Sequence, residues 1–150
     1  MSTSRDAIAA LIFTYAERLD AGELDGVAAL FRDATFRSTQ GGNYHGSAEV
    51  LAVLRQKVVL YPDGTPRTKH VTTNLTVDVD EDAGTATARS YVTVLQALPD
   101  FPLQPIFSGR YRDSFTRADG CWRWGRREVI GDLYGDVSRH VRAAGPGGPG

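Results

Sequence analysis

The feature that most limits the possible folds is a change of hydrophobic period near residue 67. Before it, apolar residues recur at helical spacing, and after it four long segments alternate between apolar and polar residues, as β-strands do. These segments are residues 68–79, 85–98, 103–117 and 121–133. Helices followed by a run of strands indicate an α+β fold in which the helices cover one face of a mostly antiparallel sheet.

Three helices are expected before the change of period. Apolar positions from 8 to 19 predict the first helix, which stops before Gly22. A second helix is predicted from Leu24 to near Asp33, and Ser47 is predicted to cap a third. A short strand at 34–38 and a brief extended piece around "NYHG" should lie between the last two.

The connections between the long strands are of two kinds. Residues 80–84 and 118–120 are acidic, contain glycine and have hairpin length, so they predict antiparallel neighbours. The middle connection carries Pro99, Pro102 and Pro105. Because proline cannot donate to a strand ladder, we expect a stiff, exposed loop there that could cover a cavity.

The geometry of such a sheet predicts an internal hollow. A long, twisted sheet bent round three helices does not collapse flat on them, which leaves a cone-shaped, barrel-like cavity open at one end. On the third long strand the row that faces inward should be the one without arginines. Its members are Phe107, Gly109, Tyr111, Asp113 and Phe115.

The stretch "TKHVTTN" can be interpreted in two ways. Its alternate positions place His70, Thr72 and Asn74 on one face, and Val71 with later apolar residues on the other. The polar row is either the wet side of an edge strand or a set of hydrogen-bonding groups in a pocket. Hydrophobic periodicity alone does not decide between the two.

Charge and cysteine content narrow the partners and the compartment. The 17 basic and 18 acidic residues nearly cancel, and no Lys/Arg-dense segment with interleaved aromatics is present, so nucleic acid is not an expected partner. The apolar runs are far shorter than the ~18 residues of a membrane span, so no membrane is expected either. The single Cys121 and the absence of a secretory signal favour the cytoplasm. We expect one domain over residues 1–142 and a disordered Gly/Pro tail over 143–150.

Three motifs carry a family resemblance. The segments "YAERLDAGELDGVAALF", "TKHVTTN" and "FTRADGCWRW" resemble the nuclear transport factor 2-like superfamily, and within it the SnoaL-like and scytalone dehydratase-like branch. The resemblance implies that the cone-shaped cavity is an active site and that His70 points into it. It also implies that Asp20, at the end of the first helix, orients and charges that histidine. Helical spacing alone would leave Asp20 as an exposed carboxylate at a helix end.

The sequence departs from the dehydratase pattern at three cavity positions. The dehydratase has a tyrosine where this chain has Leu19, a second histidine near Gln96 and an asparagine near Tyr111. A water-polarising tyrosine could come instead from Tyr15 or from Tyr44. Identity with that enzyme is therefore not expected.

The resemblance and the residue types predict a cofactor-independent acid-base enzyme. The expected reaction is that of a dehydratase (a lyase), an isomerase or a cyclase on a cyclic or polyketide-like carbonyl compound, with His70 and Asp20 as the catalytic dyad. A small hydrophobic or aromatic molecule would then be the ligand, and no metal or nucleotide is required. The predicted substrate-binding residues are Tyr15, Asn74, Tyr91, Gln96, Phe107, Tyr111 and Trp124.

Two alternatives and one assembly expectation accompany this prediction. The domain could be a non-catalytic subunit or ligand-binding module, as in the small subunits of ring-hydroxylating dioxygenases. An epoxide hydrolase site built from Arg110, Asp113 and Asp132 is opposed by strand alternation, because Arg110 and Asp113 should lie on opposite faces. A homodimer or homotrimer is expected because an outer apolar face would need covering. That face is assigned to Val71, Leu75, Val77 and either Val92 or Tyr91.

Overall fold

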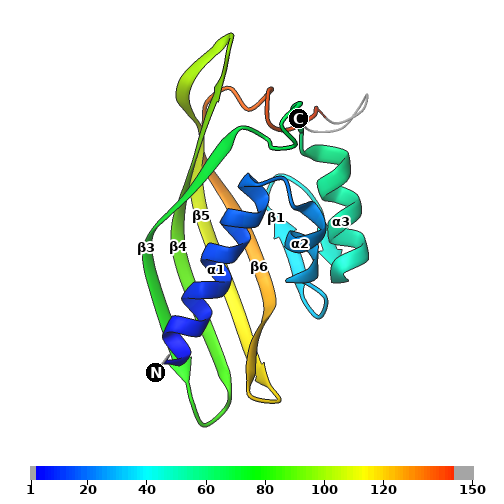
Figure 1. Cartoon of the computed structure of the whole chain (residues 1–150). Coiled ribbons are helices and arrows are strands. Elements are labelled where there is room, and N and C mark those ends of the chain that lie inside the picture. The colour runs from blue at the N-terminus through cyan, green and yellow to red at the C-terminus, as the bar shows by residue number, and fades with distance from the viewer. Residues whose placement is uncertain (1–2, 144–150) are drawn as a thin grey trace.

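The computed structural model describes residues 3–143 and arranges them as three helices packed on a six-stranded sheet (Figure 1). The helices are α1 (Ser4–Asp20), α2 (Leu24–Ala29) and α3 (Gly46–Lys57), and the strands are β1 (Thr35–Ser38), β2 (Asn43–His45), β3 (Thr68–Asp80), β4 (Thr85–Leu98), β5 (Phe101–Ala118) and β6 (Cys121–Tyr134). This order is the predicted α+β class. From residue 144 onward, the predicted Gly/Pro tail lies outside the described residues.

The sheet is open and mostly antiparallel. Its strand order is β2-β1-β6-β5-β4-β3, and the parallel pair in it is β1 with β6. The long strands β3 to β6 run behind α1 in Figure 1, while α2 and α3 cover the end of the sheet formed by β1 and β2.

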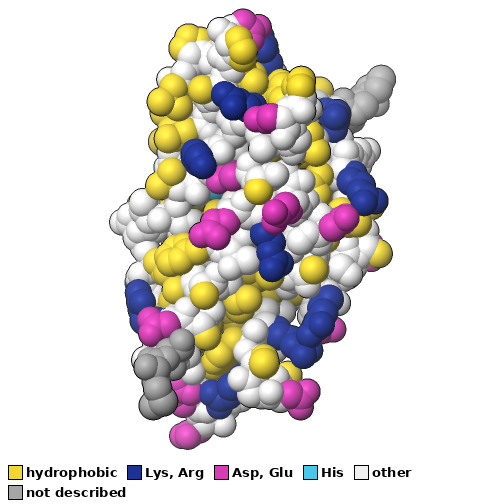
Figure 2. Space-filling view, in the orientation of Figure 1, with side chains coloured by type: hydrophobic (Ala, Val, Ile, Leu, Met, Phe, Trp, Pro, Cys, Tyr) yellow, Lys and Arg dark blue, Asp and Glu magenta, His cyan; other side chains and the backbone are white. Residues whose placement is uncertain are grey.

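Within residues 3–143, no helix has the length and apolar character needed to cross a bilayer. Figure 2 shows acidic and basic side chains interspersed over this face.

Helix α1 is fixed at both ends by local chemistry. Thr3 and Asp6 form a capping box at its start, so two backbone N–H groups that lack helical partners are satisfied. Beyond its end, Gly22 has φ of 76°, and a side chain there would overlap the Gly64 carbonyl oxygen. The chain can therefore turn tightly against the loop before β3, which leaves Asp20 facing the start of that strand.

Strand β3 contains a β-bulge that shifts its side chains from one face to the other. Pairing with β4 runs from Thr68 to Thr73 and resumes at Thr76, with one extra residue on β3. Asn74 lies in this bulge with φ of 53°, a left-handed conformation that asparagine tolerates better than β-branched residues do.

The bulge explains why the periodicity of this segment was ambiguous. Before the bulge, His70 points toward the helices, and Val71 is 39% exposed on the outer side. After it, Leu75 and Val77 pack against the core. The prediction that Val71, Leu75 and Val77 share an outer apolar face was therefore wrong, and Val92, assigned to the same face, is fully buried.

The predicted proline loop between β4 and β5 was also wrong. Strand β5 begins at Phe101, so the connection is a two-residue turn, and both Pro102 and Pro105 lie within the strand. Pairing of β5 with β6 extends only as far as Phe107 opposite Tyr134. Both prolines lie in the part of β5 beyond this pairing, and Pro105 lies opposite Leu95 at a register shift of the β4–β5 ladder, an irregularity where proline is tolerated.

Helix boundaries differ from expectation at two places. The second helix ends at Ala29, and irregular turns rather than helix lead on to Asp33. Helix α3 begins at Gly46, so Ser47 lies inside its first turn and is not its cap. The N-cap is His45, which makes no side-chain capping bond. The chain turns sharply from β2 into α3 at Gly46, whose φ is 79°, and this turn sets where the helix begins.

The bulge generates a stability prediction. Replacing Asn74 by valine should lower the free energy of unfolding by about 1–2 kcal/mol, because a β-branched residue is strained in the left-handed region. Asn74→Gly should be neutral within about 0.5 kcal/mol, and Thr76→Val, on the same strand after the bulge, should not destabilise the fold. Urea denaturation followed by circular dichroism measures all three. Equal stability of the valine and glycine variants at position 74 would contradict the strained geometry.

Candidate active site

A cavity of about 540 Å³ lies between the sheet and the helices. Its walls come from α1, α3, all six strands and the segment after β6. Leu19, Leu54, Val94, Phe107 and Val129 make much of its surface apolar. The polar and ionisable side chains in the lining include Tyr15, Tyr44, Lys57, His70, Tyr111 and His140. This is a pocket of ligand size with a few convergent polar groups.

His70 lines this cavity, and Asp20, which is not a lining residue, is in direct contact with His70. The Asp20 Oδ1 atom lies 2.6 Å from Nδ1 of His70, and the side chains are 11% and 7% exposed. The carboxylate also accepts the backbone N–H of His70 at 2.8 Å and the Thr68 hydroxyl at 2.8 Å. The end of α1 and the start of β3 are therefore joined through one carboxylate, and the imidazole is held by its neighbours.

The charges of this pair follow from their surroundings. Burial alone would raise the pKa of Asp20, but the hydrogen bonds and charge of His70, with the Thr68 hydroxyl, outweigh burial and lower that pKa below its ordinary value of 3.8. Asp20 is therefore ionised at neutral pH and can only accept hydrogen bonds. Nδ1 of His70 must carry the proton, which leaves Nε2 as the nitrogen available to a ligand.

A second histidine, His140, lies beside the first. The ring centroids of His70 and His140 are 5.6 Å apart with an interplanar angle of 67°, and both rings line the cavity. Burial first, and then the neighbouring charge of His70, lower the pKa of His140 to about 4, while Asp20 opposes the shift. Sequence reasoning missed this residue because it follows the last periodic strand, where no hydrophobic pattern predicts which way a side chain points.

A buried ion pair supports the aromatic side of the cavity. Arg127 and Asp113 have no exposed side-chain surface and form two hydrogen bonds of 2.8 and 3.0 Å. The guanidinium carbon of Arg127 is 3.6 Å from the ring centroid of Tyr111 and 4.4 Å from that of Tyr15. Both tyrosines line the cavity, so this charge orders its wall from behind.

The two buried tyrosines keep their phenolic protons. Burial raises the pKa of Tyr15 despite the nearby charge of Arg127. Burial also raises the pKa of Tyr111, well above the ordinary value of 10. Tyr15, Tyr44 and Tyr111 all lie in the lining, so both candidates for a water-polarising tyrosine reach the cavity.

Four of the predicted substrate-binding residues do not line the cavity. Asn74 is exposed, because the bulge turns it out of the inward row, and Tyr91 is 51% exposed on the outer side of the sheet. Gln96 is buried, but its amide donates to the backbone carbonyls of Pro66 and Arg139. Trp124 packs in the core and donates to Asp113. Tyr15, Phe107 and Tyr111 are placed in the lining as predicted.

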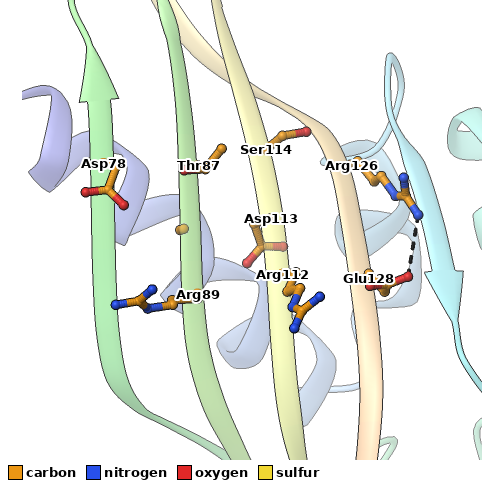
Figure 3. A pocket seen from close by; sticks show the side chains of 9 residues that line it. Asp78, Thr87, Arg89, Arg112, Asp113, Ser114, Arg126 and Glu128 are labelled. Carbon is orange, nitrogen blue, oxygen red and sulfur yellow. Dashed lines mark hydrogen bonds and ion pairs between the residues drawn. The ribbon is translucent and has the colours of Figure 1, made fainter.

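A second hollow, of about 390 Å³, lies on the sheet surface away from the helices (Figure 3). Its lining alternates in charge across the strands, with Asp78, Arg89, Arg112 and the ion pair of Arg126 with Glu128. None of the described residues that line it is a histidine.

The residues of the epoxide hydrolase alternative are not brought together. Arg110 pairs with Asp132 on the exposed face, at 2.9 and 3.0 Å, whereas Asp113 is buried against Arg127. Arg110 and Asp113 therefore lie on opposite faces of β5, as strand alternation predicted. Within residues 3–143, no three His, Cys, Asp or Glu side chains are grouped so that they could hold a metal ion.

The three helices, the bent sheet and the internal cavity define a cone-shaped α+β domain of the nuclear transport factor 2-like superfamily. The chain belongs to the SnoaL-like domain family, whose sequence profile matches residues 1–128. No curated protein sequence gives a significant match.

Solved structures share this fold over most of their length. A putative scytalone dehydratase from Novosphingobium aromaticivorans is 27% identical, with 97% of this chain and 94% of that chain covered and a TM-score of 0.72. ActVI-ORFA from Streptomyces coelicolor is 25% identical, with 85% and 96% covered and a TM-score of 0.68. A variant of Rv3472, a protein of unknown function from Mycobacterium tuberculosis, is 26% identical, with 87% and 73% covered and a TM-score of 0.68.

The lowered pKa of His140 generates a prediction about stability and pH. In the unfolded chain this histidine binds a proton near pH 6.5, and in the folded protein only near pH 4. Folding therefore releases its proton between these values, and the free energy of unfolding should fall by up to ~3 kcal/mol as the pH drops through this window. The pKa of Asp20 is lowered in the folded protein, so protonation of this carboxylate lowers the free energy of unfolding only at more acidic pH.

A matched pair of variants isolates this contribution. His140→Gln should flatten the pH dependence of the urea midpoint between pH 6.5 and 4, because glutamine does not titrate. His45→Gln, at an exposed position, should leave it unchanged. An unaltered slope in His140→Gln would show that this histidine accepts a proton as readily in the folded protein as in the unfolded chain.

Proposed function

We propose that this protein is a cofactor-independent acid-base enzyme that eliminates water from, isomerises or cyclises a cyclic, polyketide-like carbonyl compound. The observation that carries the proposal is the 2.6 Å contact between Asp20 and Nδ1 of His70 at the wall of a mostly apolar cavity. A carboxylate on one nitrogen fixes the tautomer and stabilises the charged imidazole that forms when the other nitrogen takes a proton.

The first step is removal of a proton from the carbon next to the carbonyl group. Nε2 of His70 takes the proton, the C–H electron pair forms a carbon-carbon double bond, and the carbonyl π pair moves onto oxygen. The imidazolium is then stabilised by Asp20. Placement of a general base in this way contributes typically about 10²–10⁴ in rate.

The second step returns the same proton. For an elimination, the enolate oxygen re-forms the carbonyl, and the enolate double-bond pair forms the new bond from the α to the β carbon. The bond from the β carbon to its hydroxyl breaks with its electron pair on oxygen, and His70 protonates that oxygen so that water leaves. For an isomerisation of an unsaturated ketone, the enolate is a conjugated dienolate, and His70 delivers the proton to its γ carbon while the carbonyl re-forms. The enzyme ends each cycle unchanged, so neither reaction requires a redox partner.

The lining supports a flat, uncharged substrate. Apolar walls and the Phe107 ring favour a flat, cyclic body, and the volume of about 540 Å³ lies in the ordinary range for small-molecule sites. The described lining residues include Lys57 and two histidines but neither aspartate nor glutamate. A neutral or phenolic compound fits this balance better than a cation does.

The comparisons support a reaction of this class. Membership of the SnoaL-like domain family supports an enzyme of the acid-base type, and the 27% identical neighbour is described as a putative scytalone dehydratase. We therefore place elimination of water from a cyclic hydroxy ketone first among the three reactions.

The dyad can be tested with 3-hydroxy-1-tetralone, a bicyclic β-hydroxy ketone whose loss of water gives fluorescent 1-naphthol. We expect His70→Ala to lower kcat by at least ~10²-fold, because the base is lost. Asp20→Asn should lower kcat by about 10²-fold while the fold persists, because a neutral amide does not stabilise the imidazolium as the carboxylate does. His45→Ala, outside the cavity, is the control. Naphthol formation is followed by fluorescence, and folded protein by circular dichroism.

The opposite outcomes are equally specific. Equal loss of activity and of folded protein in His70→Ala would assign this histidine to the core. Binding of 1-naphthol by the wild-type protein, without conversion of the hydroxy ketone, would indicate a ligand-binding module rather than this enzyme.

A further inference from the structure

His140 follows the last strand, but its backbone is hydrogen-bonded on both sides, as that of a strand residue is. Its carbonyl accepts the backbone N–H of Val59 at 2.9 Å, and its own N–H donates to Val137. Val141 bridges to Val58, and the Arg142 side chain donates to the Val58 carbonyl at 2.9 Å. The segment is therefore fastened to the residues that follow α3, which holds the ring against the cavity.

A second set of contacts fixes the residue just before it. Arg139 forms two hydrogen bonds with Asp100, at 3.0 and 3.2 Å. Its backbone carbonyl accepts a hydrogen bond from the Gln96 amide at 3.1 Å and another from the Tyr61 hydroxyl. Because the backbone on both sides of His140 is fixed, less conformational freedom is lost when its ring contacts a ligand.

The two nitrogens of His140 have different surroundings. Nδ1 is buried and has no hydrogen-bond partner among the described residues. A proton on Nδ1 would be a buried donor without an acceptor, which is costly. The proton therefore belongs on Nε2. The ring lines the cavity, and Nε2 is the nitrogen available to a ligand there. Burial keeps the pKa of this imidazole near 4, so the ring is neutral at physiological pH.

The two histidines are therefore chemically unequal. His70 has a carboxylate on Nδ1 and presents an unprotonated Nε2, so it can accept a proton. His140 has no hydrogen-bonded carboxylate within residues 3–143, and it presents an N–H group. With ring centroids 5.6 Å apart, one compound can contact both, through a carbon on one side and an oxygen on the other.

We propose that His140 is a second catalytic residue, whose neutral imidazole donates a hydrogen bond from Nε2 to the carbonyl oxygen of the substrate while His70 removes the proton from the neighbouring carbon. The negative charge that moves onto oxygen in that step is stabilised by this N–H group, and the proton stays on His140 throughout. A neutral imidazole can polarise a carbonyl in this way. The inference rests on the proposed acid-base function and adds the group that stabilises the enolate.

Two variants of His140 separate hydrogen bonding from packing. His140→Phe keeps a ring but has no donor, so kcat for 3-hydroxy-1-tetralone should fall by ~10²–10³-fold. His140→Gln retains an N–H donor and should recover kcat to within about 10-fold of wild type. His45→Phe, at an exposed histidine, should keep the wild-type value. Urea midpoints measured alongside show whether each variant is folded.

A binding measurement tests the same contact without turnover. In protein labelled with ¹⁵N-histidine, the nitrogen spectrum should show the proton of His140 on Nε2 between pH 5.5 and 8. Saturation with 1-naphthol, which carries its hydroxyl on a bicyclic ring, should shift this Nε2 signal. His140→Phe should bind 1-naphthol at least ~10-fold more weakly than wild type does.

The outcomes distinguish this inference from the function on which it rests. If His140→Phe keeps wild-type kcat, or if the proton lies on Nδ1, His140 has no such role, whereas the dyad stands as long as His70→Ala is inactive. If wild-type protein does not convert 3-hydroxy-1-tetralone, the proposed elimination fails and the catalytic role of His140 fails with it. A shift of the Nε2 signal by 1-naphthol would in that case leave His140 as a ligand-binding residue only.

Discussion

One carboxylate, that of Asp20, joins the helical layer to the sheet. It accepts hydrogen bonds from the Thr68 hydroxyl, the His70 backbone and the His70 ring, all within 2.6 to 2.8 Å. These bonds to a charged, largely buried acceptor are stronger than neutral ones, and loss of the acceptor would leave several donors unsatisfied. The same group sets the position of α1 against β3 and the tautomer of His70. The contact between α1 and β3 and the hydrogen bonding of the His70 ring therefore share one side chain.

The outline of this fold could be predicted from the sequence because its elements are long and strongly periodic. The period-two segments after residue 67 and the stripe of α1 correspond to β3–β6 and α1 within a few residues. The failures have local causes. In β3, one extra residue at the bulge reverses which side chains face the helices. A simple alternating pattern assumes that no residue is inserted, so it cannot predict this reversal. At the start of β5, Pro102 and Pro105 mimic a loop, because only the sheet topology shows that β6 has ended there.

The site was predictable only in part, for a related reason. A resemblance could suggest Asp20 and His70, because both lie in motifs with a recognisable spacing. Gln96 and Trp124 were assigned to the correct side of the sheet, but the hydrogen bonds that occupy them are made with Arg139 and Asp113, at sequence separations of 43 and 11 residues. His140 depends on contacts with residues 58, 59 and 137, and nothing in its local sequence marks them. Long-range contacts of this kind leave no periodic signal.

The cavity persists because the two ends of the cone are built differently. One end is filled by Phe31, Phe115 and Trp124, stacked or tilted at centroid distances of 5.1 Å around Trp124, with the buried Arg127–Asp113 pair beside them. At the other end β5 and β6 carry glycine where neighbouring groups leave no room for a side chain. A side chain on Gly109 would overlap the Ile130 carbonyl and the Phe107 ring, and one on Gly131 would overlap the Tyr134 hydroxyl.

These glycines leave room for the rings of Phe107 and Tyr134, which line the cavity and meet edge to face with centroids 5.3 Å apart. The packed end stabilises the fold, so the open end can remain unfilled beside His70. Aromatic rings and the imidazole of His70 therefore border one hollow that the packing of the other end does not fill.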